Sequence, residues 1–180
     1  MTESANKPAT QHSIEGTKTL LIVRHAKSSW DIGSLNDFER PLNDRGKKDA
    51  PIMAKRLLDK QITIDAFVSS PAKRAKKTAE LFCEVHGKAD DQIVFISKLY
   101  HAPLEVFYEV IEELEETLSK VAIFSHNPGI TDFVNSLIDA VHIDNMPTCG
   151  VFAIQAQAGK WKDFKKAKKE LLFFDYPKLG

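Results

Sequence analysis

The sequence predicts an α/β protein, a three-layer α/β/α sandwich around a mostly parallel sheet of six strands. Short, continuous apolar runs recur along the chain, as expected for strands that are buried on both faces. Helical patterns separate the first four runs, and this alternation is typical of parallel sheets whose crossover connections are helices. The six runs are residues 18–23, 66–68, 93–96, 121–124, 151–154 and 171–174.

The first expected helix lies between the first two strands. Asn43 can cap it, because an Asn side chain accepts hydrogen bonds from the free N–H groups of a first turn. The helix should extend to about Lys60, and Pro51 should kink it by removing one backbone hydrogen bond. Apolar residues at helical spacing predict an inner face of Ala50, Met53, Leu57 and Leu58.

Prolines mark the other three helices. Pro71 fits the first turn of the second helix, Pro103 opens the third, and the fourth should follow Asn127-Pro128-Gly129. The positions expected to face the sheet are Ala75, Thr78, Ala79 and Phe82 in the second helix, Leu104, Phe107, Val110, Ile111 and Leu114 in the third, and Phe133, Val134, Leu137 and Ile138 in the fourth.

The length of 180 residues is that of one domain. We expect residues 1–17 to be a disordered leader, because they lack apolar periodicity, and residues 18–180 to form the single domain. The chain has 25 basic and 25 acidic residues, and this balance argues against a nucleic-acid-binding or polybasic membrane-binding protein. No apolar stretch is long enough to span a bilayer, and the polar N-terminal sequence lacks the apolar core of a signal peptide.

The two cysteines, Cys83 and Cys149, cannot form a disulfide framework, and both fit packing positions. These features together predict a reduced, soluble, cytoplasmic protein. They leave its oligomeric state open.

The informative side chains follow the apolar runs, because ligands of open α/β sheets bind at the carboxyl ends of the strands. The first run leads into Arg24, His25 and Ser28, the second leads into Arg74, and the fourth leads into His126. A lone histidine or arginine has many structural uses. Two histidines and two arginines that follow three strands of one sheet predict a shared site.

The chemistry of these residues suits phosphoryl transfer. Guanidinium groups bind phosphoryl oxygens through planar, paired hydrogen bonds. A neutral imidazole can attack phosphorus and carry the group as phosphohistidine, and a protonated imidazole can stabilise the charge of the transition state. We include Ser28 as a further candidate phosphate ligand.

Other kinds of site fit the sequence less well. The arginines would repel a metal ion bound between the two histidines, and no carboxylate ligand is evident. The sequence has neither a Walker loop nor a G-x-S-x-G elbow, and neither cysteine is followed by the loop and arginine of a cysteine-dependent phosphatase.

The segment LLIVRHAKSSWD resembles the RHG motif of the histidine phosphatase superfamily, which includes phosphoglycerate mutases, with Ala26 in place of the glycine. RPLNDRGKKDA, VSSPAKRAKKTAE and FSHNPGI resemble the later motifs in the same order. The RHAKS form, the RPL-x-x-RG pattern and the short chain point to the SixA-type branch of small phosphohistidine phosphatases. The resemblance covers residues 19–177 and implies a phosphoglycerate mutase-like fold.

The resemblance also implies roles. His25 is then the nucleophile that accepts the phosphoryl group, and Arg24, Arg74 and His126 form the phosphate pocket, with no metal or organic cofactor. Larger relatives carry a glutamate proton donor after the third strand, where this chain reads Leu-Tyr-His-Ala-Pro-Leu-Glu from residue 99. Glu105 is the candidate donor in this region, and Asp31 and Asp37 are weaker candidates, while a surface or packing role is as good an interpretation for His101.

A missing acid favours a substrate with an easy leaving group. An alkyl phosphate benefits from general acid catalysis, commonly by ~10²–10⁴-fold, whereas the imidazole of phosphohistidine titrates near neutral pH. Short connections at the site suggest that it is open to a side chain on another protein. We therefore expect a phosphatase that hydrolyses phosphohistidine on a protein partner through phospho-His25, and we expect no nucleic-acid or membrane partner.

Two alternatives remain open at this point. The protein can be a phosphatase or mutase that acts on small phosphate esters, or a non-catalytic phosphoprotein-binding module on the same fold. Residues 160–169, which are basic and include Trp161 and Phe164, are expected to form a solvated connection between the last two strands, with a docking patch for an acidic protein as the alternative.

Overall fold

The computed structural model of the protein describes residues 16–30 and 36–179. The expected leader, apart from its last two residues, and the candidate Asp31 lie outside these ranges. The described strands are β1 (Lys18–Arg24), β2 (Ala66–Ser69), β3 (Ile93–Phe95), β4 (Lys120–Ser125), β5 (Val151–Ala156) and β6 (Lys169–Asp175). The described α-helices are α1 (Asp44–Asp59), α2 (Lys73–Val85), α3 (Leu104–Glu112) and α4 (Gly129–Asn135).

The predicted mostly parallel sheet is confirmed. Its six strands lie in the order β3-β2-β4-β1-β5-β6. The first four of these are parallel, whereas β5 and β6 are antiparallel to their neighbours. The chain therefore ends in a hairpin-like pair of strands at one edge of a parallel sheet.

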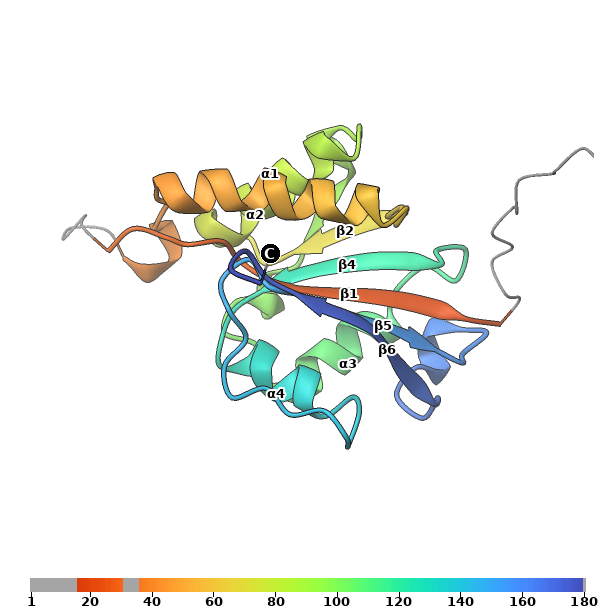
Figure 1. Ribbon diagram of the computed structural model, residues 1–180. Helices are drawn as coiled ribbons and strands as arrows, with labels where there is room; N and C mark the ends of the chain where they lie inside the picture. Colours follow the sequence, from red (N-terminus) through yellow and green to blue (C-terminus); the bar gives the residue numbers. More distant parts are fainter. Residues whose placement is uncertain (1–15, 31–35, 180) are drawn as a thin grey trace, which may run out of the picture.

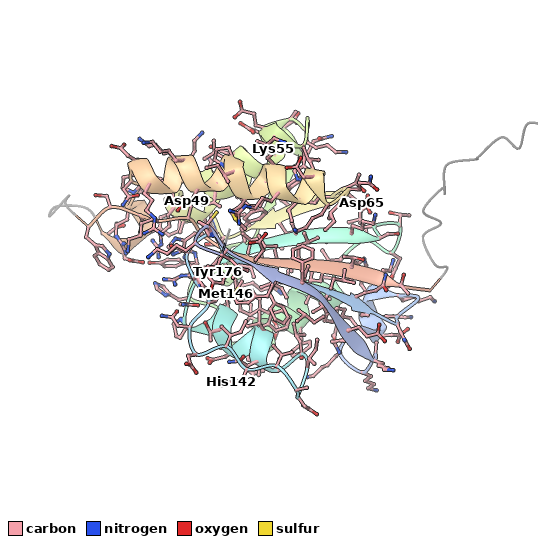
Figure 2. The ribbon with its side chains drawn as sticks, in the orientation of Figure 1. Asp49, Lys55, Asp65, His142, Met146 and Tyr176 are labelled. Carbon is pink, nitrogen blue, oxygen red and sulfur yellow. The ribbon has the colours of Figure 1, made fainter. Side chains whose placement is uncertain are left out.

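Two helix layers complete the sandwich, with α1 and α2 on one face of the sheet and α3 and α4 on the other (Figure 1). Side chains fill the space between the sheet and both layers (Figure 2). One core cluster unites Met53 and Phe82 of the first layer with Leu21 of β1. The other unites Phe107 and Phe133 of the second layer with Leu20, so alternate residues of β1 serve opposite cores.

Three local predictions about the helices differ from the structure. Leu58 is 40% exposed, because Leu57 occupies the inner face and the next residue is rotated away from it. Helix α1 includes Pro51, the carbonyl that Pro51 leaves unpaired belongs to the exposed residue Lys47, and the kink expected there stays a prediction. Pro71 precedes α2, which begins at Lys73. Helices α3 and α4 end before Leu114 and Leu137.

The N-terminus of α1 forms as expected. The Asn43 side chain accepts a hydrogen bond from Gly46 N–H at 2.9 Å and so caps the helix. Among the described residues, no helix has the length and apolar character needed to cross a bilayer.

Candidate active site

Three strand ends meet at one edge of the sheet and form a pocket of about 240 Å³. Arg24 at the end of β1 pairs with Ser125 at the end of β4, and Ser69 at the end of β2 pairs with Phe124. The residues that follow these strands therefore lie together, as the sequence predicts. The pocket is lined by Arg24, His25, Lys27, Ser28, Trp30, Asp37, Arg40, Arg74, His101, His126, Asn127 and Thr148.

His25 is held with one ring nitrogen free of hydrogen. Its Nδ1 lies 2.8 Å from the carbonyl oxygen of Ala26, so Nδ1 carries the proton and donates it to that oxygen. Nε2 then has a lone pair, which accepts a hydrogen bond from Arg74 Nε at 3.2 Å. This is the state in which an imidazole can act as a nucleophile.

Burial, together with the positive charges of Arg74, Arg24 and Arg40, lowers the pKa of His25 to about 3, although a hydrogen bond to Ala26 acts in the opposite direction. Burial has the largest effect, because the residue is only 7% exposed.

Ala26 stands where the RHG motif has glycine. Its methyl group is buried in the core cluster beneath α1 and α2, and its N–H donates to the Thr78 hydroxyl at 3.0 Å. The same hydroxyl donates to the Arg74 carbonyl at 2.7 Å, so Thr78 ties the segment after β1 to the start of α2.

His126 lies beside His25, and the two ring centroids are 5.1 Å apart. Burial, followed by the positive charges of His25 and Arg74, lowers the pKa of His126 to about 2. These effects favour a neutral His126 in the unliganded protein, and a protonated second imidazole beside a bound phosphoryl group stays a prediction.

A neutral His126 can still donate a hydrogen bond. Its Nε2 lies 2.8 Å from the Ser70 hydroxyl, which also accepts from Ala72 N–H at 3.3 Å. We assign the hydroxyl as the donor to Nε2, the tautomer that leaves a hydrogen on Nδ1 for a ligand. The proton of His126 is then on Nδ1. That atom is buried and has no hydrogen-bond partner within the described part of the chain.

Arg24 leaves a second donor unsatisfied. Its Nη1 donates to the Met146 carbonyl at 2.6 Å, while its Nε is buried without a partner among the described residues. Buried polar atoms are nearly always paired in native proteins, so two unpaired donors around one pocket mark a site that a polar ligand completes. A phosphoryl group has the acceptor oxygens that both donors require.

Asp37 balances the charge of Arg74 in the absence of a ligand. Its Oδ2 accepts from Arg74 Nη2 at 2.8 Å and from the Tyr100 hydroxyl at 2.8 Å, and its Oδ1 accepts from Arg40 Nη1 at 2.8 Å. Partial burial alone would raise the pKa of Asp37, but the hydrogen bonds from Tyr100, Arg40 and Arg74 hold it below the usual range. Asp37 is thus an ionised clamp for two arginines and has no proton to donate near neutral pH.

Arg40 was not singled out from the sequence, although it begins the RPLNDRG segment. It lies over the Trp30 ring at 3.3 Å from the ring centroid, and its Nη2 donates to the Ser28 hydroxyl at 2.6 Å. Ser28 does line the pocket, and its hydroxyl is engaged by this arginine. Three guanidinium groups and Lys27 therefore face one carboxylate, which gives the pocket a net positive charge.

Of the residues after β3 that could donate a proton, His101 lies at the pocket and Glu105 does not. Glu105 is exposed on the first turn of α3 and is not among the residues that line the pocket. His101 does line it, with Nε2 at 3.2 Å from Asp37 Oδ2 and its ring centroid 6.0 Å from that of His126. A backbone φ of 52°, unusual for a residue with a side chain, places His101 there.

The remaining histidines lie outside the site as far as the structure describes it. His142 is exposed and pairs with Asp144 at 3.3 Å (Figure 2), and His86 contacts the Phe67 ring. His12 lies outside the described residues. Within the described ranges, no group of three or more histidine, cysteine or acidic side chains is placed to hold a metal ion.

Comparison with known proteins gives a consistent result. The family model of the histidine phosphatase superfamily, branch 1, matches residues 20–99. A crystal structure from Agrobacterium tumefaciens, assigned as the phosphohistidine phosphatase SixA, has a TM-score of 0.75 and 26% sequence identity, and the match covers 89% of this chain and 98% of that one. The protein histidine phosphatase SixA in complex with tungstate has the same fold, with a TM-score of 0.75 at 19% identity.

The curated relatives are more varied. An uncharacterized chloroplastic protein of Arabidopsis thaliana is 27% identical over 172 residues, which are 91% of this chain and 76% of the relative. A protein of the same plant, assigned as a 2-carboxy-D-arabinitol-1-phosphatase, is 29% identical over 134 residues, which are 66% of this chain and 27% of the relative.

Proposed function

We propose that this chain, which belongs to the histidine phosphatase superfamily and has the fold of its SixA-type branch, hydrolyses phosphohistidine on a protein through a covalent phospho-His25 intermediate. The observation that carries the proposal is the unprotonated Nε2 of His25, in a pocket where Arg24 Nε and His126 Nδ1 have no partner among the described residues. A nucleophile and two unused donors in one positively charged pocket suit a phosphoryl group.

The reaction has two displacements. His25 Nε2 attacks phosphorus, the bond from phosphorus to the substrate imidazole breaks, and that imidazole leaves with a proton. Water then attacks phospho-His25, which releases inorganic phosphate and restores the Nε2 lone pair. Arg24, Arg74 and the Nδ1–H of His126 stabilise the phosphoryl oxygens in both steps, and Ser28 is a further candidate ligand.

His101 is the group best placed to supply a proton to a leaving group. It lines the pocket, whereas Asp37 is held ionised and Glu105 is outside the pocket. We therefore assign the proton-donor position to His101 and no role to Glu105. Phosphohistidine depends on this donor less than an alkyl phosphate does, because a leaving imidazole can itself be protonated near neutral pH.

Short connections favour a protein substrate. Helix α3 begins at Leu104, soon after β3 ends at Phe95, and α4 begins at Gly129, soon after His126. Neither connection holds an insertion that could close over a small molecule, and His101 at the pocket is 53% exposed. We also propose that the protein acts in the cytoplasm, in keeping with its two free cysteines.

Small phosphate esters are the second candidate substrates, and the relative assigned as a sugar-acid phosphatase favours them. Comparing kcat/KM for a histidine-phosphorylated protein with that for a panel of sugar phosphates separates the two. We expect the phosphohistidine substrate to be preferred. A higher kcat/KM for any sugar phosphate would refute the proposed substrate class while leaving the phosphatase activity intact.

Alkaline quenching with ³²P-labelled substrate tests the covalent step, because the bond from phosphorus to an imidazole nitrogen is labile in acid and stable in base. We expect label on wild-type protein and none on His25→Ala. Arg74→Ala and His126→Ala should still be labelled, at rates lower by about 10²–10³, the usual loss for one preorganised donor. Unchanged turnover in His25→Ala would refute the phospho-His25 intermediate, and label on His126 would reverse the two roles. Absence of turnover by the wild-type protein would instead support a non-catalytic binding module.

A further inference from the structure

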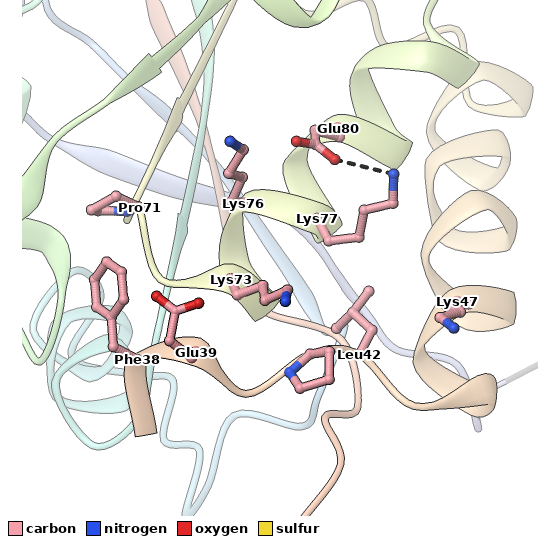
Figure 3. A pocket seen from close by; sticks show the side chains of 10 residues that line it. Phe38, Glu39, Leu42, Lys47, Pro71, Lys73, Lys76, Lys77 and Glu80 are labelled. Atoms are coloured by element: carbon pink, nitrogen blue, oxygen red, sulfur yellow. Dashed lines mark hydrogen bonds and ion pairs between the residues drawn. The ribbon is translucent and has the colours of Figure 1, made fainter. Parts of the chain in front are cut away.

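A second groove lies directly beside the His25 pocket. It has a volume of about 510 Å³, within the ~300–1,000 Å³ that is usual for ligand clefts. Helix α2 forms one side, and the segment before α1 and the first turn of α1 form the other (Figure 3). We call it the lysine groove, after Lys47, Lys73, Lys76 and Lys77, which line it.

The four lysines of the groove face only two carboxylates. Lys77 is paired with Glu80 at 3.1 Å, as Figure 3 shows, and Glu39 is the other carboxylate in the groove. Lys47 and Lys73 form no ion pair with any residue that the structure describes, and Lys76 lies over the Phe95 ring at 5.3 Å from its centroid. The groove therefore has a net positive charge in a chain whose total charge is zero.

The groove and the His25 pocket are lined by the same chain segments. Asp37 and Arg40 line the pocket, while Phe38 and Glu39, the residues between them, line the groove. Arg74 lines the pocket and its neighbour Lys73 lines the groove. The two sites are therefore neighbours, and we infer that a polypeptide with one phosphorylated side chain in the pocket extends its flanking residues into the groove.

The lining combines charge with apolar surface. Phe38, Leu42 and Pro71 supply side chains that can pack against a polypeptide, and the lysine ammonium groups stand around them. Acidic residues of the protein, including Glu109, Glu112 and Glu113, belong to the α3 region on the opposite face of the sheet (Figure 1). An acidic partner is therefore attracted to the groove side of the molecule and repelled from the α3 side.

We propose that the lysine groove binds an acidic segment of the substrate protein next to its phosphorylated histidine. The proposal rests on the proposed function and makes the charge around the phosphohistidine the determinant of substrate choice. It commits to a protein segment with aspartate or glutamate residues beside the modified histidine, because those carboxylates can pair with the groove lysines while the phosphohistidine occupies the pocket.

The other basic stretch, residues 160–169, is in the wrong place for this role. Strand β5 runs antiparallel to β1, so Ala156 pairs with Lys18 at the end of the sheet opposite His25. Trp161 and Phe164 in this stretch are buried core residues. Its exposed lysines, Lys162 and Lys166, therefore provide a charge-matched control far from the pocket.

The test uses two histidine-phosphorylated peptides with the same central sequence, flanked either by aspartate and glutamate or by serine and glutamine. Para-nitrophenyl phosphate serves as a small substrate that needs only the pocket. The groove variant is Lys47→Glu with Lys76→Glu, which leaves Lys73 beside Arg74 in place. The control variant is Lys162→Glu with Lys166→Glu.

We expect wild-type protein to prefer the acidic peptide in kcat/KM by about tenfold, through KM, and to lose this preference at high salt. The groove variant should lose the preference and keep its activity on para-nitrophenyl phosphate, and the control variant should keep both. Equal use of the two peptides by the wild type, or equal losses in both variants, would overturn the proposal.

A separate measurement distinguishes failure of the lysine-groove proposal from failure of the proposed phosphohistidine phosphatase function. If wild-type protein hydrolyses para-nitrophenyl phosphate and neither peptide, the phosphohistidine assignment has failed. Binding of the unphosphorylated acidic peptide, measured by calorimetry, then still tests the groove. We expect weaker binding to the groove variant than to the control variant, and equal binding to both would refute the groove as a docking site.

Discussion

At the residue scale, the protons of the two imidazoles determine how the site can work. The Ala26 carbonyl fixes the proton of His25 on Nδ1, and the Ser70 hydroxyl leaves that of His126 on Nδ1. A neutral imidazole thus has two uses in this site. His25 offers a lone pair to phosphorus, and His126 donates a hydrogen bond. Burial keeps both rings neutral, and backbone and hydroxyl partners set the tautomers.

The first prediction at this scale concerns the proton donor. His101→Gln should lower kcat for an alkyl phosphate by about 10²-fold, at the low end for loss of a general acid, and should lower kcat for phosphohistidine much less. Glu105→Gln is the matched control, since it removes an acid from the nearby exposed turn of α3, and it should change neither rate. Steady-state kinetics on both substrates, with a pH profile for each variant, provide the measurement.

If Glu105→Gln lowered kcat for the alkyl phosphate and His101→Gln did not, the proton donor would be Glu105. A collapse of phosphohistidine turnover in His101→Gln would contradict a different step, the argument that a leaving imidazole needs little help. Loss of activity with an unchanged pH profile in His101→Gln would mean that the side chain positions Asp37, which it contacts at 3.2 Å, and transfers no proton.

At the scale of elements, the site depends on how two loops pack against each other. The residues after β4 lead into α4, and Gly129 at its start lies against the turn that contains His101. A methyl group on Gly129 would lie 1.8 Å from the Ala102 carbonyl oxygen, a distance that no packing permits. The absence of a side chain at this position therefore lets both histidine-bearing loops reach the pocket.

We predict that Gly129→Ala destabilises the protein by about 1–3 kcal/mol, the usual cost of overpacking, and also lowers kcat because His101 or His126 must move. Gly159→Ala is the control, because a methyl group there meets no atom within 4 Å. Urea unfolding and para-nitrophenyl phosphate kinetics report the two effects. If Gly129→Ala were destabilised but kept its activity, the two loops would have moved apart without displacing His101 or His126, and the predicted loss of kcat would be wrong.

The elements themselves could be predicted well from the sequence, and the positions of their ends less well. All six strands follow apolar runs and were predicted from them, and with them the convergence of His25, His126, Arg24 and Arg74. The expectation that every run is buried on both faces was wrong for the two edge strands, β3 and β6, which are largely exposed because each has a neighbour on one side only. Leu58 was wrongly predicted to face the core, because Leu57 and Leu58 both fit the helical apolar pattern and only the packing of the folded chain shows which of them is buried. Pro71 was misplaced because a proline suits both a first turn and the loop before it.

The loop residues of the site could not be placed from periodicity. Arg40, Asp37 and His101 come from irregular segments, and only the folded chain brings Asp37 between Arg74 and Arg40. One motif carried a partial signal for them, since the RPLNDRG segment contains Arg40. The lowered pKa of His126 could not be predicted either, because it depends on burial that the sequence does not reveal.

At the scale of the whole molecule, folding places two ionisable rings where they cannot readily be charged. The pKa of His25 is lowered to about 3 and that of His126 to about 2, whereas an unfolded histidine titrates near 6.5. Between these values the unfolded chain binds protons that the folded chain does not. The free energy of unfolding must then fall as pH falls, starting near pH 6.5.

The last prediction gives this effect a size and a test. Each buried histidine contributes at most about 1.4 kcal/mol per pH unit to the slope between pH 6 and 4, and His126→Gln should remove one such contribution. Urea unfolding followed by circular dichroism from pH 4 to 8 measures how the free energy of unfolding changes with pH. The comparison between wild type and variant is of this slope and not of the absolute stabilities. His142→Gln, which alters an exposed histidine, should leave the slope unchanged. An equal slope in wild type and His126→Gln would mean that His126 binds its proton in the folded state as readily as in the unfolded one, and it would restore the protonated imidazole as the group that meets the phosphoryl oxygens.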